Sequence, residues 1–209
     1  MPTSGFVLLV YRLPTKPTAP RVAVWRQLKK VGAVYLQQSV CVFPDTGAIH
    51  RELQPVLTKI DGSLGTYNLI PLHDVPAAEQ DKLIAEFRAQ SAKRFQEIVE
   101  NCEVNFQKEI EFETFRQNFT YEEAEEIRAE YDKIVRWFQA VRRRDWFGAP
   151  NQSEARRWLG RCKKLLEGFE ENVFRAQGGE VEVEVDSTSD RRPTRSRPLR
   201  SRRLRATGA

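Results

Sequence analysis

Three groups of basic residues are the side chains whose type and spacing best suit a chemical role in this sequence. One group lies on the segment 19–31, one is an unbroken run of three arginines, and one lies near the C-terminal end. These candidate nucleic-acid contacts are Arg21, Arg26, Lys29, Lys30, Arg142, Arg143, Arg144, Arg191, Arg192, Arg195, Arg197, Arg200, Arg202, Arg203 and Arg205. Lysine and arginine neutralise phosphates and give a salt-dependent affinity without sequence specificity. The pattern therefore favours nucleic-acid binding, with the third group as a non-specific phosphate clamp.

Each basic group also has a simpler explanation. At 100° per residue, Val24, Leu28 and Val31 form an apolar stripe on the segment 19–31, and the cations at 26, 29 and 30 centre on the opposite side, where solvent is expected. The run 142–144 lies near the end of an expected helix, where cations interact favourably with the helix dipole. The C-terminal arginines would also suit a solubilising extension. The residues alone leave these alternatives open.

The net charge of +5 is unevenly distributed along the 209 residues. The segment from Asp186 to Ala209 contains eight arginines and two aspartates, a net charge of +6, so the preceding 185 residues carry a net charge of −1. The high isoelectric point, about 9.2, therefore describes an extension and not the folded part of the chain.

Motifs for catalysis, metal binding and cofactor binding are absent from the sequence. No GxGxxG or GxxxxGK[ST] loop occurs, and the two histidines are far in sequence from Cys41, Cys102 and Cys162. The cysteines are sixty or more residues apart and form no CxxC motif, so buried free thiols are expected in place of a disulfide framework or a zinc site. We predict a protein that is not an enzyme and has no catalytic residue, metal or cofactor.

The first 75 residues are expected to form a small sheet covered by helices. Strands are predicted over 5–13 and 66–72, and two further strands within 33–43 meet at a turn over 37–39. The first helix follows a possible N-cap at Thr18 and ends at Gly32, and the second lies within 45–65. The order βαββαβ is typical of a ferredoxin-like sheet, so the fold class is α+β.

The rest of the chain is expected to be helical and then disordered. A long helix is predicted over 76–102, a strand over 102–112 from alternating apolar residues, a helix after a capping box at Thr120, and a last helix capped by Asn151 or Ser153. The Arg/Ser/Pro-rich end has too little apolar content to fold. The domain organisation is thus a ferredoxin-like domain (5–75), a helical extension packed on it within the same unit (76–176), and a disordered Arg-rich tail (180–209).

The longest apolar run, Gly5–Tyr11, is too short for a membrane span or a secretory signal. We therefore expect a cytoplasmic protein without a membrane partner. The open strand edges of a small sheet favour pairing between copies, which makes a homodimer plausible.

Three separated stretches of the sequence resemble the N-terminal domain of the ChrB family of chromate-resistance regulators. They are VLLVYRLPTKPTAPRVAVWRQLKKVGAVYLQQSVCVFPDT (7–46), KEIEFETFRQNFTYEEAEE (108–126) and RRDWFGAP (143–150). The resemblance covers about 5–176. It implies a transcription regulator that binds the promoter DNA of chromate efflux genes. Longer family members carry a second, chromate-responsive domain, so the resemblance also implies a separate partner of that C-terminal type.

The first seventy residues are also similar to Cas2 and to the related domain of PaaX-type repressors. Cas2 proteins carry an aspartate, a proposed metal ligand, after the tyrosine that ends the first strand, whereas Tyr11 is followed here by Arg12. A cation at this place opposes Mg²⁺ binding, which disfavours metal-dependent cleavage. The alternatives to a DNA-binding regulator are a divergent Cas2-like nucleic-acid-processing enzyme, an oxyanion reductase, and a protein–protein interaction module without DNA binding.

Overall fold

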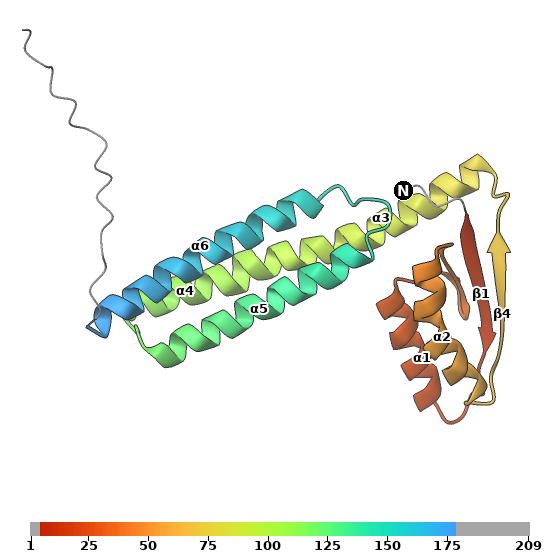
Figure 1. Cartoon of the computed structure of the whole chain (residues 1–209), viewed down its shortest axis with the longest axis horizontal. Helices are drawn as coiled ribbons and strands as arrows, with labels where there is room; N and C mark the ends of the chain where they lie inside the picture. The colour runs from red at the N-terminus through yellow and green to blue at the C-terminus, as the bar shows by residue number, and fades with distance from the viewer. Residues whose placement is uncertain (1–4, 179–209) are drawn as a thin grey trace, which may run out of the picture. The chain divides into compact units, whose positions relative to one another are not determined.

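The computed structural model describes residues 5–178, and the predicted tail with its eight arginines lies outside them. Four strands and two helices come first, followed by a series of helices (Figure 1). The elements are β1 (Phe6–Arg12), α1 (Ala19–Val31), β2 (Val34–Gln37), β3 (Val40–Pro44), α2 (Gly47–Asp61), β4 (Thr66–Leu72), α3 (Ala77–Glu100), the π-helix η1 (Asn101–Phe106), α4 (Gln107–Phe115), α5 (Tyr121–Arg143) and α6 (Gln152–Ala176).

The four strands form one antiparallel sheet in the order β2-β3-β1-β4. β2 and β3 are joined by a tight turn, at which Ser39 adopts a positive φ of 62°. This strand order and the sequence order βαββαβ confirm the predicted ferredoxin-like sheet and the α+β class. The central strands β1 and β3 are buried on both faces, which explains why β1 is an almost continuous apolar run.

One face of the sheet packs against α1 and α2 (Figure 1). The apolar stripe of α1 predicted from the helical wheel is buried, with Val24 and Leu28 at 0% exposure. α1 ends where predicted, because Gly32 has a φ of +100° and its N–H donates to the carbonyl of Leu28. Thr18 occupies the N-cap position as predicted, and its carbonyl accepts a hydrogen bond from the N–H of Val22, but its side chain makes no capping hydrogen bond.

The opposite face of the sheet is covered by the beginning of α3 and by the loop that connects α5 to α6. Phe6 of β1 stacks on Phe87 of α3 with ring centroids 6.3 Å apart, and Phe147 of the loop packs against both rings. Arg88 donates from Nε to the carbonyl of Phe147 at 2.9 Å. This apolar cluster fixes the sheet against the helical part of the chain.

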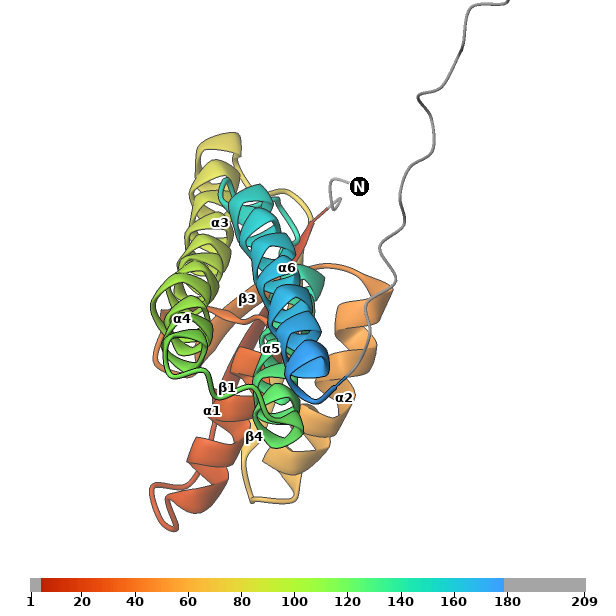
Figure 2. The ribbon, with the colours of Figure 1, turned by 90° about the vertical axis from the view of Figure 1, so that its left-hand side faces the viewer.

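The helical part has its own core between α3, η1, α4, α5 and α6. The long helices α3, α5 and α6 run side by side (Figures 1 and 2). The core includes Phe95, Ile98, Ile134, Cys162 and Phe169, none of which is more than 1% exposed. None of the helices within 5–178 is both long and apolar enough to cross a membrane.

The strand predicted over 102–112 was wrong, because this segment continues α3 as η1 and α4. Cys102, Phe106 and Ile110 are buried, whereas Val104 and Phe112 are about half exposed. The buried residues are four apart, so one face of a helix meets the core formed with α5 and α6. The prediction used apolar residues at nearly every second position. Some of these residues belong to the buried face of the helix and the others to its solvent-facing side.

The two predicted caps in the helical part have different outcomes. The Thr120 hydroxyl accepts a hydrogen bond from the N–H of Glu123, which confirms the N-cap of α5. Asn151 precedes α6 but makes no capping hydrogen bond. Its Nδ2 donates instead to the carbonyl of Ala92 at 2.9 Å, so this side chain connects the start of α6 to α3.

Candidate nucleic-acid interface

Three of the four basic residues predicted on α1 are exposed as expected. Arg21, Arg26 and Lys30 all belong to the exposed class. Arg26 and Lys30 are carried by the helix surface opposite Val24 and Leu28, which anchor α1 on the sheet, whereas Arg21 lies on one shoulder of the apolar stripe. The helix therefore presents these three cations to solvent, where phosphates can reach them.

Lys29 is an exception to the predicted solvent-facing side of α1. Its side chain is partly buried, donates to Oε1 of Gln90 on α3 at 3.4 Å, and lies 5.1 Å from the centre of the Tyr35 ring. Burial and the nearby positive charge of Arg94 lower the pKa of Lys29. The prediction failed here because the Lys29 side chain reaches Gln90 of α3 and the Tyr35 ring of β2, and a helical wheel includes neither contact.

The run of arginines at the end of α5 also divides into two kinds of side chain. Arg142 and Arg143 are exposed, whereas Arg144 is partly buried. Arg144 donates from Nε to the carbonyl of Ala140, and from Nη1 to the carbonyls of Lys29 and Lys30 at 3.0 and 3.4 Å. These carbonyls lie at the C-terminal ends of two helices, where a cation is favourable. Arg144 thus interacts with the C-terminal end of a helix, as the helix-dipole explanation for this run of arginines predicted. It does so at the ends of both α5 and α1.

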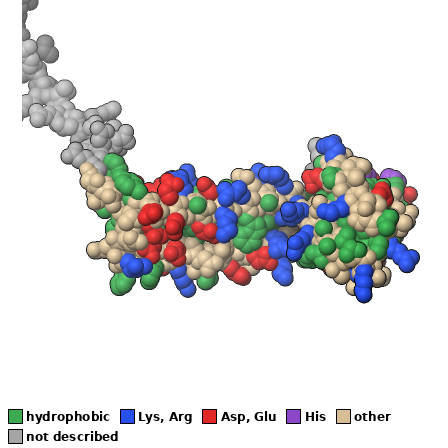
Figure 3. Space-filling view, turned by 90° about the horizontal axis from the view of Figure 1, so that it is seen from below, with side chains coloured by type: hydrophobic (Ala, Val, Ile, Leu, Met, Phe, Trp, Pro, Cys, Tyr) green, Lys and Arg blue, Asp and Glu red, His purple; other side chains and the backbone are tan. Residues whose placement is uncertain are grey.

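The hydrogen bonds of Arg144 bring together two basic groups that are more than one hundred residues apart in the sequence. We call Arg26 and Lys30, the exposed cations in the C-terminal half of α1, together with the exposed Arg142 and Arg143, the basic junction. Figure 3 shows Lys and Arg side chains gathered where the helical part meets the sheet part, while Asp and Glu side chains gather farther along the helices. The structure does not extend to the third predicted group, the arginines from 191 to 205.

A groove of about 1,040 Å³ lies beside Arg21, between the end of β1, α1 and the turn from β2 to β3. Arg12, Arg21 and Trp25 line it, and Trp25 is 49% exposed. An exposed indole and two guanidinium groups can stack on a base or hold a phosphate. Arg12 and Trp25 were not among the predicted site residues, because only the packing of α1 on the sheet places them together.

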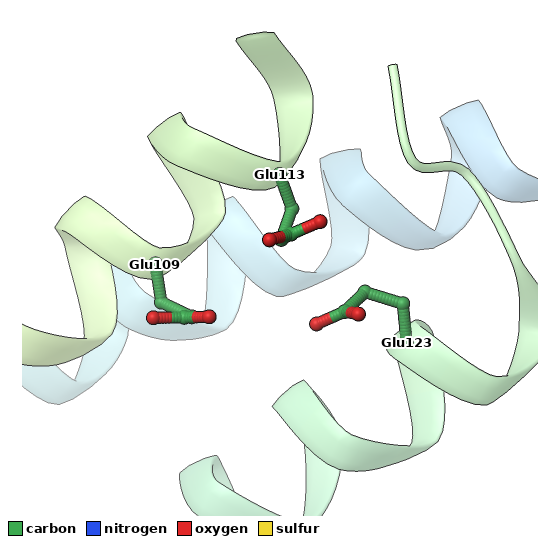
Figure 4. A group of neighbouring side chains, drawn as sticks. All are labelled: Glu109, Glu113 and Glu123. Atoms are coloured by element: carbon green, nitrogen blue, oxygen red, sulfur yellow. The ribbon is translucent and has the colours of Figure 1, made fainter. Parts of the chain in front are cut away.

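Three glutamates form an acidic cluster at the far end of the helical part, which the sequence interpretation did not identify. One carboxylate oxygen of each of Glu109, Glu113 and Glu123 lies within 4.8 Å of the others (Figure 4). Oxygen ligands of this kind suit a divalent cation. However, Asn118 donates from Nδ2 to Glu113 at 2.6 Å and to Glu123 at 3.1 Å, and Arg116 lies 3.4 Å from Glu113. These hydrogen bonds account for the burial of Glu113 without a metal.

The cysteines are free and buried, as predicted. His50 pairs with Asp45, whose Oδ1 lies 2.7 Å from Nε2 of the histidine, at the start of α2. Burial raises the pKa of Cys41 to about 12, so this thiol stays protonated at neutral pH. A buried, protonated thiol is a poor nucleophile.

Comparisons with known proteins agree on one family. The family described as "Protein ChrB, N-terminal" matches residues 21–180. Protein ChrB of Cupriavidus metallidurans is 26% identical over 155 residues, which are 74% of this chain and 44% of that relative. The chain therefore spans less than half the length of the relative. The match begins within α1 and includes β2, β3, α2, β4 and the helical part, so all four residues of the basic junction lie inside it, and the chain belongs to the ChrB N-terminal family.

Proposed function

We propose that this protein acts in chromate resistance by binding DNA and regulating chromate efflux genes. Membership of the ChrB N-terminal family supports the link to chromate resistance. The basic junction supports DNA binding. Further support for phosphate binding comes from ion pairing: several exposed cations elsewhere on the surface pair with glutamates, whereas those of the basic junction do not.

The observation that carries the proposal is that the cations of the basic junction are unpaired. Within residues 5–178, no carboxylate lies within 4.0 Å of the charged groups of Arg26, Lys30, Arg142 or Arg143. Several exposed cations of the helical part, in contrast, lie beside a glutamate. These pairs are Lys82–Glu79, Arg94–Glu97, Arg128–Glu170, Lys133–Glu130, Lys163–Glu167 and Arg175–Glu171. Unpaired cations contact phosphates without first breaking an ion pair.

The junction also has a defined geometry. Because Arg144 binds the last carbonyls of α1, the end of α5 and the end of α1 are held at a fixed distance. We infer that this arrangement lets cations from both helices contact one ligand at the same time. A DNA backbone, with regularly spaced phosphates, is a ligand that benefits from such an arrangement. The C-terminal arginines would add further phosphate contacts to this surface.

The test is a titration of a fluorescently labelled duplex with the full chain, followed by anisotropy at several salt concentrations. Arg26→Glu combined with Lys30→Glu should weaken binding and reduce the slope of log K against log salt by about 2, since each phosphate contact contributes about 0.9. The matched control is Lys108→Glu combined with Lys164→Glu, two exposed lysines of the helical part. Equal losses in both double variants would show that only the net charge matters and would remove the basic junction as the interface.

A further inference from the structure

A small pocket is lined by residues of α1, of α3 and of the C-terminal end of α5. Its charged and polar lining consists of Lys29, Gln90, Ser91, Arg94 and Arg144. The rings and methyl groups of Phe87 and Val141 close its apolar side. Lys29 comes from the sheet part of the chain, and the other residues come from the helical part, so the pocket exists only because these parts are packed together.

The pocket contains three cations and no carboxylate in its lining. Two acidic groups lie nearby. Glu97 pairs with Nη1 of Arg94 at 2.8 Å, and the exposed Glu52 of α2 attracts Arg144 from a longer distance. Among the described residues, no carboxylate lies within ion-pair distance of Lys29 or Arg144. The positive charge of the pocket is therefore only partly neutralised.

This arrangement opposes folding unless something compensates it. Burial and the proximity of Arg94 lower the pKa of Lys29, and the same two causes lower the pKa of Arg144. Both groups thus lose hydration and repel a third cation. An anion in the pocket would replace the lost hydration and would turn the repulsion into attraction to a common ligand.

Hydrogen-bond donors in the pocket remain available for such a ligand. The guanidinium of Arg144 is held by Nε and Nη1 bonds to three backbone carbonyls, and within residues 5–178 these bonds leave the N–H groups of Nη2 without a partner. Among the residues that the structure describes, Lys29 donates only to Gln90, at a long 3.4 Å. The buried hydroxyl of Ser91 adds a neutral donor. The donors are thus fixed in place before any ligand arrives.

The size of the pocket restricts the ligand. Its volume of about 50 Å³ exceeds the roughly 10–15 Å³ that a cavity needs to hold one water molecule but is far below the several hundred Å³ of an organic-ligand site. A DNA phosphate carries a sugar on each of two oxygens, so it can present only its two unsubstituted oxygens to a pocket of this volume, whereas a free oxyanion can enter whole. We propose that the pocket formed by Lys29, Ser91, Arg94 and Arg144 binds a small, free tetrahedral oxyanion.

Sulfate is a suitable probe, because it has this shape and charge and undergoes no redox step. Calorimetric titration of the full chain with sodium sulfate should give saturable binding, and sodium chloride at equal ionic strength should not. Lys29→Gln combined with Arg94→Gln should weaken binding about tenfold or more, because charge-assisted hydrogen bonds are lost. Arg94→Gln alone is the second variant, since its half-exposed side chain is removed without disturbing the packing.

The matched control is Lys93→Gln combined with Lys108→Gln, which removes two exposed positive charges from α3 and α4. This control should bind sulfate as the parent chain does. The absence of saturable binding, or an equal loss in the control, would overturn the proposal. If sulfate does not bind and the double variant loses DNA affinity instead, the cluster is a DNA-phosphate contact and the free-oxyanion site is refuted. Sulfate binding by a chain that does not bind DNA would support the site and remove only the proposed DNA interface.

Discussion

Replacing Arg144 by methionine tests whether one side chain connects the sheet part to the helical part. Methionine keeps an apolar stem but removes the donors that bind the carbonyls of Lys29 and Lys30 at 3.0 and 3.4 Å. The second bond is long, so we count one good charge-assisted bond between the parts and one to Ala140 within α5. The carbonyls at the end of α1 would lose this partner.

The expected magnitude follows from these bonds and from an opposing effect. A hydrogen bond to a charged group contributes about 1.5–3 kcal/mol. Arg144 is partly exposed, so water replaces some of the loss, and the variant also removes the repulsion between Arg144 and Arg94. We therefore expect a net loss of about 1–2 kcal/mol. For a chain of this size, each kcal/mol lowers the melting temperature by about 2–4 °C.

The assay is urea unfolding of the full chain, followed by circular dichroism and tryptophan fluorescence. Arg143→Met is the matched control. Arg143 is adjacent to Arg144 in the sequence, but its side chain is exposed and makes no hydrogen bond or ion pair among the described residues. The control should remain within about 0.5 kcal/mol of the parent chain. If Arg144→Met has no larger effect than Arg143→Met, the bonds to α1 do not hold the two parts together, and the fixed geometry of the basic junction loses its support.

Three further predictions concern other parts of the chain. Cys41, Cys102 and Cys162 should react with a thiol reagent at pH 8 only after unfolding, because all three are 0% exposed, and rapid reaction of the native chain would contradict the packing. Burial and neighbouring carboxylates raise the pKa of Glu123, so the ionised carboxylate opposes folding. The protonated carboxyl group favours the folded state, and this contribution to the free energy of unfolding is lost as pH rises through the folded-state pKa. Glu123→Gln should therefore raise the melting temperature slightly at pH 7. The difference should shrink as pH falls through the raised pKa and disappear below about 4.3, the ordinary glutamate pKa; a difference independent of pH would exclude this cause. Truncation after Gly178 should weaken DNA binding and flatten its salt dependence, and an unchanged salt slope would identify the removed arginines as a solubilising extension.

Local patterns in the sequence were sufficient where each element depends mainly on its own residues. The apolar run of β1, the stripe of α1 and the glycine after Val31 predicted a strand, a helix and its end, and all three are confirmed. A strand buried on both faces needs a continuous apolar run, and a helix on a sheet needs one apolar stripe. The order of these elements then favoured the ferredoxin-like sheet, because few topologies fit βαββαβ.

The tertiary structure decided the segment 102–112. Its apolar residues fit a period of two nearly as well as the helical period, so local sequence did not separate strand from helix. Packing against α5 and α6 selects the helix, because only the helix places Cys102, Phe106 and Ile110 together in the core.

The sequence by itself determined which basic residues exist and which side of α1 they share. Only the tertiary structure divided them by role, because the positions of Lys29 and Arg144 depend on elements that are sixty or more residues away along the chain. No helical wheel includes a neighbouring helix. The exposed cations of the basic junction remain available to phosphates, whereas Lys29, Arg94 and Arg144 surround a pocket that forms only after the sheet and the long helices have packed together.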